Sequence, residues 1–359
     1  MRRDPYLDFL RALAIVMVLI HHVSQQWPVP LQWLTQYTHH GAAGVDLFFA
    51  LSGFLIGGLF WREARQCGTI HLGRFWSRRW LRTIPPYLAG LGLAYTAVLV
   101  FRAETFDFGY LLFLQNYYDT PPFFLVSWSL CVEEHFYLLV PLLFFLLIRI
   151  RGTPFKNRLG FTLFGLALLP LLSRFAIMEE AVPKFGYYTT ATHLNADALF
   201  LGFGVAYLLY YEGKKITAKA RVACFLLLVT ALVLLSIEMS PAFEYVFGRA
   251  LVAVCFVSLL LLGVEARFTR GVGVRPVTFV AVTSYSVYLT HALVIHAHTR
   301  LFGGLAADYP LPFLVLLIAG IFSVGWAFFL VFERGALALR ERWAPRDVPA
   351  KQYAAEPAS

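Results

Sequence analysis

Apolar residues recur along the chain in stretches of about the length that crosses a lipid bilayer. A transmembrane helix needs roughly 20 mainly apolar residues to span the hydrocarbon core. Such stretches lie near residues 6–24, 40–60, 84–102, 127–148, 159–177, 196–211, 222–238, 244–263, 276–299 and 312–333. The pattern predicts an all-α polytopic transmembrane bundle of about ten helices, with a brief apolar segment at 110–117 lying at the membrane interface.

Composition favours the same class of protein. Of the 359 residues, 59% are hydrophobic and 14% are charged, whereas soluble domains carry about 25% charged residues. This disfavours a large soluble core. Neither a disulfide nor a metal site is expected, because the four cysteines are isolated and lack metal-ligand spacing. They are Cys67, Cys131, Cys224 and Cys255.

Basic residues in the connecting segments predict the orientation of the bundle. Lys and Arg concentrate in alternate loops, which the positive-inside rule assigns to the cytoplasm, and the other loops hold little beyond Lys184 and Arg300. Both termini are therefore predicted to be cytoplasmic. The same bias explains the net charge of +9 without nucleic-acid binding. We expect an integral membrane domain over residues 1–343 and a disordered cytoplasmic tail over 344–359.

The first apolar stretch carries a cation and a base on one face. Arg11 and His22 are eleven residues apart. At 100° per residue they return to nearly the same helix face, roughly 16 Å apart along the axis. Ionisable groups inside a membrane usually face protein or water and mark a functional path. We interpret Arg11 as lying toward the cytoplasm and His22 as a candidate general base near the outer end; a histidine bonded to a neighbouring helix at the membrane interface is the alternative.

Further ionisable residues are predicted at depths near that of His22. Alternating helix directions put Asp46, Glu133, Asp197 and His291 in the outer leaflet. A carboxylate such as Asp46 or Glu133 would hold the His22 tautomer and stabilise its imidazolium. Hydrogen bonding between helices, without a catalytic role, is the alternative for the buried acids.

The ninth apolar stretch carries a run of hydroxyl groups. Ser284, Tyr285 and Tyr288 precede His291 in the sequence SYSVYLTH. We predict that these side chains line a polar cavity, although interhelical hydrogen bonding would explain them too.

A basic stripe precedes the third apolar stretch. Arg74, Arg78 and Arg82 are four residues apart, so they share one face if the segment is helical. Arginine forks bind phosphate through two hydrogen bonds. The stripe suits a soluble polyphosphate such as coenzyme A on the cytoplasmic side, and contact with lipid headgroups is the alternative. Pro85 and Pro86 are expected to start the third helix.

Five motifs resemble, in their order along the chain, those of the membrane acyltransferase-3 family, bacterial enzymes that O-acylate cell-surface glycans and some secreted metabolites. They are LDFLR at 7–11 with His22, GVDLFFALSGFLI at 44–56, RRWLRTIPPY at 78–87, WSLCVE at 128–133 with FY at 136–137, and SYSVYLTH at 284–291. A terminal glutamate matches at Glu333. The resemblance covers about residues 6–334. Asn195 departs from the pattern, since arginine is expected two residues before Asp197.

The resemblance implies a multi-pass enzyme of the bacterial cytoplasmic (inner) membrane. Its donor would be cytoplasmic acyl-CoA, commonly acetyl-CoA, used as a substrate and not as a permanently bound cofactor. Its acceptor would be a hydroxyl group of an extracytoplasmic glycan or glycolipid, with membrane lipid as a further partner. Arg11 and His22 match the family's essential arginine–histidine pair, and Arg79 with Arg82 matches a paired-arginine motif.

Two other classes remain open on the residues alone. A proton-coupled transporter would use the same buried acids and histidines as a relay, although we find neither the internal repeats nor the paired broken helices common in transporters. A non-enzymatic scaffold or lipid-flipping partner of glycan synthesis would not need the face shared by Arg11 and His22. Release of CoA thiol that depends on an acceptor separates the enzyme from both.

Overall fold

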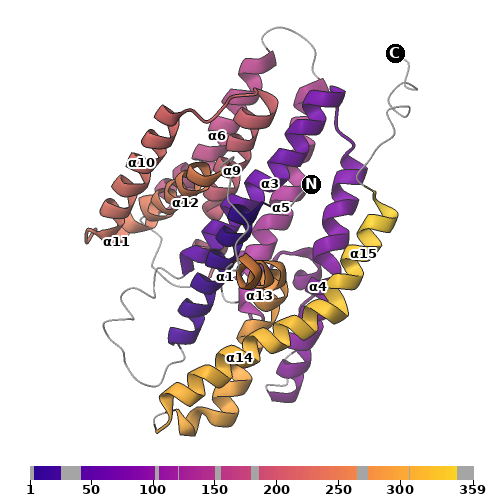
Figure 1. The fold of residues 1–359 in the computed structure, drawn as a ribbon, viewed down its shortest axis with the longest axis vertical. Coiled ribbons are helices and arrows are strands. Elements are labelled where there is room, and N and C mark those ends of the chain that lie inside the picture. The colour runs from indigo at the N-terminus through magenta and orange to yellow at the C-terminus, as the bar shows by residue number, and fades with distance from the viewer. Residues whose placement is uncertain are drawn as a thin grey trace.

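The computed structural model describes residues 4–25, 42–101, 105–119, 121–149, 155–178, 186–264, 274–306 and 308–345. Its long helices are α1 (Pro5–Gln25), α3 (Gly44–Cys67), α4 (Leu72–Phe101), α5 (Trp128–Arg149), α6 (Phe155–Ala176), α10 (Ala218–Ser236), α12 (Arg249–Gly263), α13 (Val274–Phe302) and α14 (Pro310–Phe328). These residues contain no strand, which confirms the predicted all-α class (Figure 1).

Shorter helical segments join or extend the long ones. The α-helical pieces are α7 (Tyr187–Thr190), α8 (Thr192–Asn195), α9 (Asp197–Ala206), α11 (Pro241–Phe243) and α15 (Arg334–Trp343). The 3₁₀ turns are η2 (Phe108–Leu112), η3 (Gln115–Tyr117), η4 (Leu125–Ser127) and η7 (Gly303–Leu305). The π-helical turns are η5 (Tyr207–Tyr211), η6 (Glu244–Gly248) and η8 (Phe329–Glu333). The apolar segment expected at 110–117 thus forms the turns η2 and η3.

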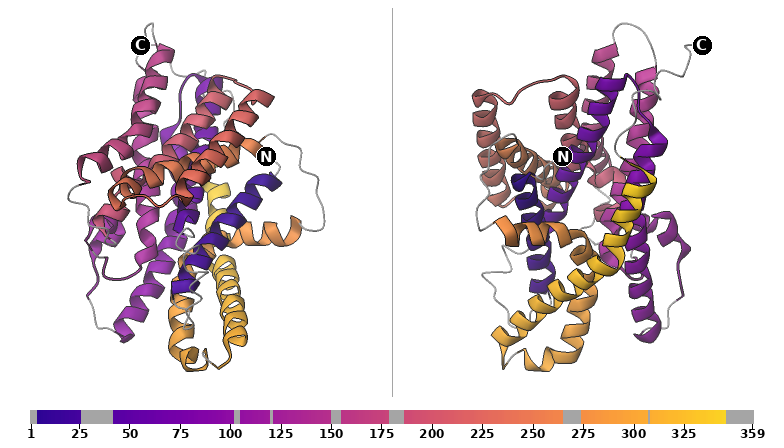
Figure 2. Two further views of the ribbon diagram at one scale, coloured as in Figure 1. Left: turned by 90° about the vertical axis from the view of Figure 1, so that its left-hand side faces the viewer. Right: turned by 45° about the vertical axis from the view of Figure 1, so that its right-hand side comes forward.

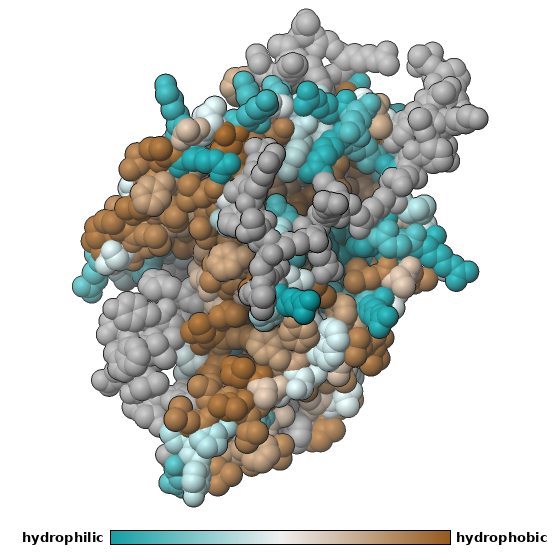
Figure 3. Space-filling model, in the orientation of Figure 1, coloured by the Kyte–Doolittle hydropathy of each residue, from teal (hydrophilic) through white to brown (hydrophobic). Residues whose placement is uncertain are grey.

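The helix content agrees with the predicted number of spans. Nine of the described helices are long and apolar enough to cross a membrane, and α9 with η5 adds a shorter apolar helix over Asp197–Tyr211. Hydrophobic residues cover most of the face in Figure 3, with hydrophilic residues gathered mainly toward its upper end. The orientation and the division at residue 343 stay predictions, and residues 346–359 of the expected tail lie outside the described residues.

Two predicted helix boundaries were wrong. Helix α4 begins at Leu72 and contains Pro85 and Pro86 in its interior, so the basic stripe and the third apolar stretch form one helix. The last span does not end at residue 333 but continues through η8 into α15. The two extensions contact each other, and Arg78 of α4 forms an ion pair with Glu341 of α15 at 3.1 Å. This long-range contact has no signal in local sequence.

The core of the bundle lies where α3 crosses α9. A Cβ atom at Gly53 would overlap the backbone of Leu199, and one at Gly202 would overlap the backbone of Ala50. Such close approach is typical of membrane helices, which associate through packing at small residues because lipid gives them little hydrophobic drive. The crossing makes α3 the most enclosed of the candidate spans.

Helix α1 is held between α3, α12 and α13. Gly44 of α3 lies against Ala14 and Val18, and the Tyr6 hydroxyl donates to the Leu259 carbonyl of α12 at 2.5 Å. Figure 2 shows α13 and α14 as neighbouring antiparallel helices at one end of the molecule. This packing brings the last turns of α1 against α13.

Candidate active site

His22 lies beside His291. The two imidazole rings, from the last turn of α1 and from α13, have centroids 4.9 Å apart and planes inclined by 54°. His291 is fully buried and His22 is half-buried. In the described part of the chain, no hydrogen bond or ion pair links Asp46 or Glu133 to His22. The expected outer cluster of acids and histidines is therefore divided, with His291 as the neighbour of His22.

The face of α13 next to His291 carries the predicted hydroxyl groups. Tyr288 lies 5.6 Å from His291 between ring centroids. Its hydroxyl is 2.6 Å from Ser129 Oγ and donates to the Val126 carbonyl at 2.8 Å. Tyr288 thus joins α13 to the start of α5, next to the histidine pair.

The other two hydroxyl residues of the predicted run bond to backbone. Ser284 Oγ donates to the Ala281 carbonyl at 3.0 Å, within its own helix. Tyr285 donates to the Thr83 carbonyl of α4 at 2.9 Å. The Tyr285 contact is the interhelical hydrogen bond of the alternative interpretation, whereas the Ser284 contact stays within α13.

Arg11 lies near the opposite end of α1 from His22. It forms an ion pair with Asp8, one turn away, at 3.0 Å. The charges that act on Arg82 of α4 include those of Arg11 and Glu333. Glu333 is buried and accepts a hydrogen bond from Ser286 at 2.6 Å. The expected separation of a cation end and a histidine end on one helix is therefore present.

The basic stripe on α4 faces carboxylates from three other elements. Arg74 forms an ion pair with Glu63 of α3 at 2.7 Å, and Arg78 pairs with Glu341 of α15. Arg82 has Glu333 of η8 in its electrostatic surroundings. A polyphosphate that binds these arginines would have to compete with acids already present.

Arg79 points instead toward α5. Its guanidinium lies 3.7 Å from the Glu133 carboxylate and 3.9 Å from the centre of the Tyr137 ring, whose hydroxyl it also contacts. The neighbouring Glu134 is buried and accepts from Thr83 at 2.8 Å. The adjacent acids of α5 are thus explained by partners on α4, and Glu133 is linked to the arginine pair and not to His22.

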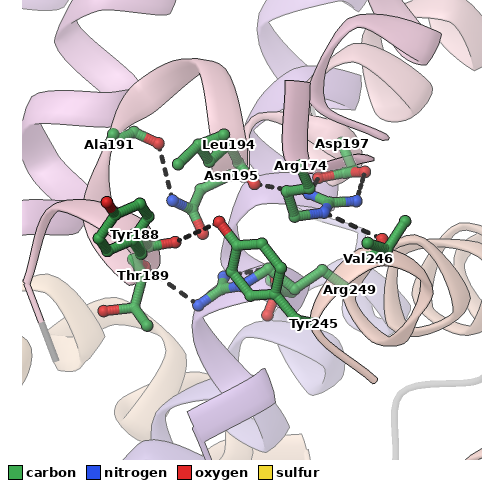
Figure 4. A network of polar contacts seen from close by, with 11 residues as sticks. Arg174, Tyr188, Thr189, Ala191, Leu194, Asn195, Asp197, Tyr245, Val246 and Arg249 are labelled. Carbon is green, nitrogen blue, oxygen red and sulfur yellow. Dashed lines mark hydrogen bonds and ion pairs between the residues drawn. The ribbon is translucent and has the colours of Figure 1, made fainter. Parts of the chain in front are cut away.

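Asp197 and Asp46 belong to a polar network between α3, α6, α9 and α12. Asp197 receives two hydrogen bonds of 2.8 Å from Arg174 of α6. Asp46 lies 3.7 Å from Arg249, which also donates to the Thr189 carbonyl at 3.2 Å. In Figure 4, Arg174 lies beside Asp197 and Val246, and Arg249 reaches toward Thr189 next to Tyr245, whose hydroxyl donates to the Tyr188 carbonyl.

Arg174 and Arg249 were missed by the sequence analysis. Position 195, where the family pattern has arginine, holds Asn195, and the cation beside Asp197 is Arg174 of a different helix, which is fully buried. A signal was available, since both arginines interrupt apolar stretches, at 159–177 and 244–263. A buried ionised carboxylate is costly without a compensating cation, so Asp46 and Asp197 suggested cations elsewhere in the bundle.

A groove of about 390 Å³ lies between α4 and α15. It is lined by Ser77, Trp80, Leu81, Ile84, Pro85 and Trp343. The groove adjoins the Arg78–Glu341 ion pair and is formed by the end of the bundle that carries the basic stripe.

Comparison with known proteins gives one family and a set of bacterial relatives. A family model described as an acyltransferase domain matches residues 4–332. The chain is 28% identical over 323 residues to the Staphylococcus aureus (strain COL) protein named "Putative O-acetyltransferase SACOL0978", covering 82% of this chain and 51% of that protein. It is 27% identical over 322 residues to the O-acetyltransferase OatA of S. aureus (strain NCTC 8325), covering 81% and 50%. The chain therefore spans about half the length of these relatives, and no solved structure matches it.

Proposed function

Because the chain belongs to the acyltransferase family whose model covers residues 4–332, we propose that it is an integral membrane O-acetyltransferase. It moves an acyl group, acetyl in the simplest case, from cytoplasmic acyl-CoA to a hydroxyl group of an extracytoplasmic carbohydrate such as an exopolysaccharide or O-antigen. The observation that carries the proposal is the arrangement of α1, with Arg11 near one end and His22 beside His291 at the other.

The donor binds at the end that carries the basic residues of α4. Arg82, with Arg11 and Glu333 in its surroundings, has no ion pair within 4 Å among the described residues. A phosphate that contacts Arg82 therefore competes with no ion pair within 4 Å. Arg74 and Arg78 already pair with Glu63 and Glu341, so a phosphate at either would share the guanidinium with a carboxylate.

His22 acts as general base at the opposite end. An imidazole is suited to take a proton from an alcohol near neutral pH. As His22 accepts the hydroxyl proton, the acceptor oxygen attacks the thioester carbonyl, a C–O bond forms, and the C–S bond breaks. The thiolate of CoA then takes up a proton, so that the products are an ester and free CoA thiol. Holding both substrates in position within the bundle raises the rate of this step, because their translational freedom is already lost on binding.

The sidedness of acetyl transfer tests the proposal. Membrane vesicles from the source bacterium, with the gene deleted and then restored, are supplied with acetyl-CoA labelled in the acetyl group. Inverted vesicles, which expose the cytoplasmic face, should label their own envelope glycans and release CoA thiol. Sealed right-side-out vesicles should do neither, since acetyl-CoA does not cross the bilayer. Equal labelling with and without the gene would reject the acetyltransferase, as would thiol release without an ester product.

His22→Ala tests the assignment of the base in the same vesicles. The expected loss is about 10²-fold or more in the rate of transfer, within the range for general-base catalysis. The matched control is His71→Ala, which removes an exposed histidine between α3 and α4. The control should keep its activity. Full activity of inserted His22→Ala would remove the base assignment.

A further inference from the structure

We infer that His291 is a positioning residue for His22. In this arrangement the buried Nε2 of His291 accepts a hydrogen bond from an N–H of the His22 imidazole, and this bond determines which nitrogen of His22 takes the proton of the acceptor hydroxyl. The inference rests on the proposed function, in which His22 is the base.

The proton of the neutral His291 ring is located by its backbone contacts. Nδ1 lies 2.7 Å from the Tyr288 carbonyl and 3.2 Å from the Val287 carbonyl. A carbonyl oxygen can only accept, so Nδ1 carries the hydrogen and donates it. In the neutral ring, Nε2 therefore carries a lone pair and is an acceptor.

This acceptor is buried without a partner in the described part of the chain. His291 has no exposed surface, and its Nε2 has no hydrogen bond among the described residues. Buried polar atoms are nearly always paired, and an exception in a folded protein asks for a functional explanation. The His22 ring, with its centroid 4.9 Å away, makes no direct hydrogen bond to this Nε2 in the structure. A small rotation of the His22 ring, or a single bridging water, would complete the contact.

Two other imidazoles lie near His22 in the described part of the chain, those of His21 and His296. His296 is exposed, so water can satisfy its ring nitrogens. His21 meets His22 edge to face at 5.2 Å, and its Nε2 is 3.0 Å from the Gln25 amide. Asp46 and Glu133, the carboxylates first considered for this task, lie with Arg249 and Arg79. Among these described neighbours, His291 is the buried group whose lone pair has no partner.

A neutral partner suits this location in the membrane. A carboxylate beside His22 would bring a negative charge into a low-dielectric region, where a charge needs its own compensation. The imidazole of His291 orients the base without adding charge. During transfer, His22 gains the hydroxyl proton on its free nitrogen while its other N–H stays bonded to His291 Nε2, and the proton later passes to the CoA thiolate.

Two substitutions at His291 separate orientation from packing. His291→Gln keeps an acceptor oxygen near the position of Nε2, whereas His291→Leu removes it. In inverted vesicles with acetyl-CoA, His291→Leu should lower the apparent kcat about 100-fold with the KM for acetyl-CoA changed less than about twofold. His291→Gln should recover at least about a tenth of the wild-type rate, since it restores the acceptor.

His298→Leu is the matched control on the same helix. His298 is also buried, and its Nε2 already bonds to the Phe313 carbonyl at 3.2 Å. Its loss should lower the melting temperature in detergent and leave kcat nearly unchanged. A wild-type kcat for His291→Leu, with His22→Ala inactive, would overturn the inference and leave the proposed function standing. So would a His291→Gln protein as inactive as His291→Leu at normal melting temperature and KM.

Discussion

At the scale of single residues, the four arginines at the start of α4 have different surroundings although they share one short segment. Arg74, Arg78 and Arg79 each form an ion pair, with Glu63, Glu341 and Glu133. Arg82 has charged neighbours but no ion pair within 4 Å in the described part of the molecule. An incoming phosphate therefore replaces no existing salt bridge at Arg82, and this residue is expected to contribute most to donor affinity.

We predict that Arg82→Ala raises the KM for acetyl-CoA about tenfold or more, because a hydrogen bond to a charged group contributes about 1.5–3 kcal/mol. The KM is measured in inverted vesicles over a range of acetyl-CoA concentrations. Arg342→Ala, at an exposed position of α15, controls for the general loss of one positive charge. An unchanged KM in Arg82→Ala would refute the predicted donor contact.

Arg79 is expected to behave differently from Arg82. Its guanidinium compensates Glu133 and packs on Tyr137, so Arg79→Ala leaves a partly buried carboxylate without its cation. We expect Arg79→Ala to lower the melting temperature in detergent, whether or not the KM for acetyl-CoA changes. Arg79→Ala combined with Glu133→Gln should recover part of that loss. No recovery in the double variant would show that the pair does not stabilise the fold.

At the scale of elements, the crossing of α3 and α9 decides where the core lies. Gly53 and Gly202 let the two backbones meet, since a Cβ at either position overlaps the other helix. Gly204 is on the same short helix α9, yet a Cβ there meets no atom within 4 Å. The two glycines of α9 therefore provide a matched test of the crossing.

We predict that Gly202→Ala destabilises the protein by about 1–3 kcal/mol or more, the usual range for overpacking. Gly204→Ala should be neutral or slightly stabilising, because alanine favours helix over glycine by about 1 kcal/mol. Both are compared by thermal unfolding in one detergent. Equal melting temperatures for the two variants would contradict the close crossing.

At the scale of the whole molecule, buried ion pairs connect helices that are distant in sequence. Arg174 of α6 meets Asp197 of α9, and it also donates to the Val246 carbonyl of η6 at 3.0 Å. Arg249 of α12 meets Asp46 of α3. Because Arg174 is fully buried, its charge depends on Asp197 for compensation.

We predict that Asp197→Asn lowers stability by about 3–5 kcal/mol, the usual effect of removing one partner of a buried pair. The double variant Asp197→Leu with Arg174→Met should be more stable than Asp197→Asn, because it leaves no uncompensated charge. Glu238→Gln, at an exposed position, is the control for loss of one acid. If the double variant has a lower melting temperature than Asp197→Asn, the uncompensated charge of Arg174 is not the cause of the instability of Asp197→Asn.

Much of the molecule followed from sequence pattern alone, and the errors share one origin. The apolar stretches predicted the class and the approximate number of helices, and the motifs predicted the family. The boundaries failed at Pro85 and at residue 333, on the two helices, α4 and α15, that meet through the Arg78–Glu341 ion pair. No partner for Asp197 was predicted from the sequence, and the structure pairs it with Arg174.

The sequence by itself determined what is local in this protein. The length of the apolar stretches predicts the membrane-spanning helices. The helical repeat of 3.6 residues per turn places Arg11 and His22 on one face of α1, which runs unbroken over Pro5–Gln25. Only the tertiary structure decided which helix faces meet. In the folded bundle His291 lies beside His22, and Asp46 and Glu133 form ion pairs with Arg249 and Arg79. The physical reason is that rotation and crossing of helices depend on packing among residues far apart in the chain, which no local periodicity encodes.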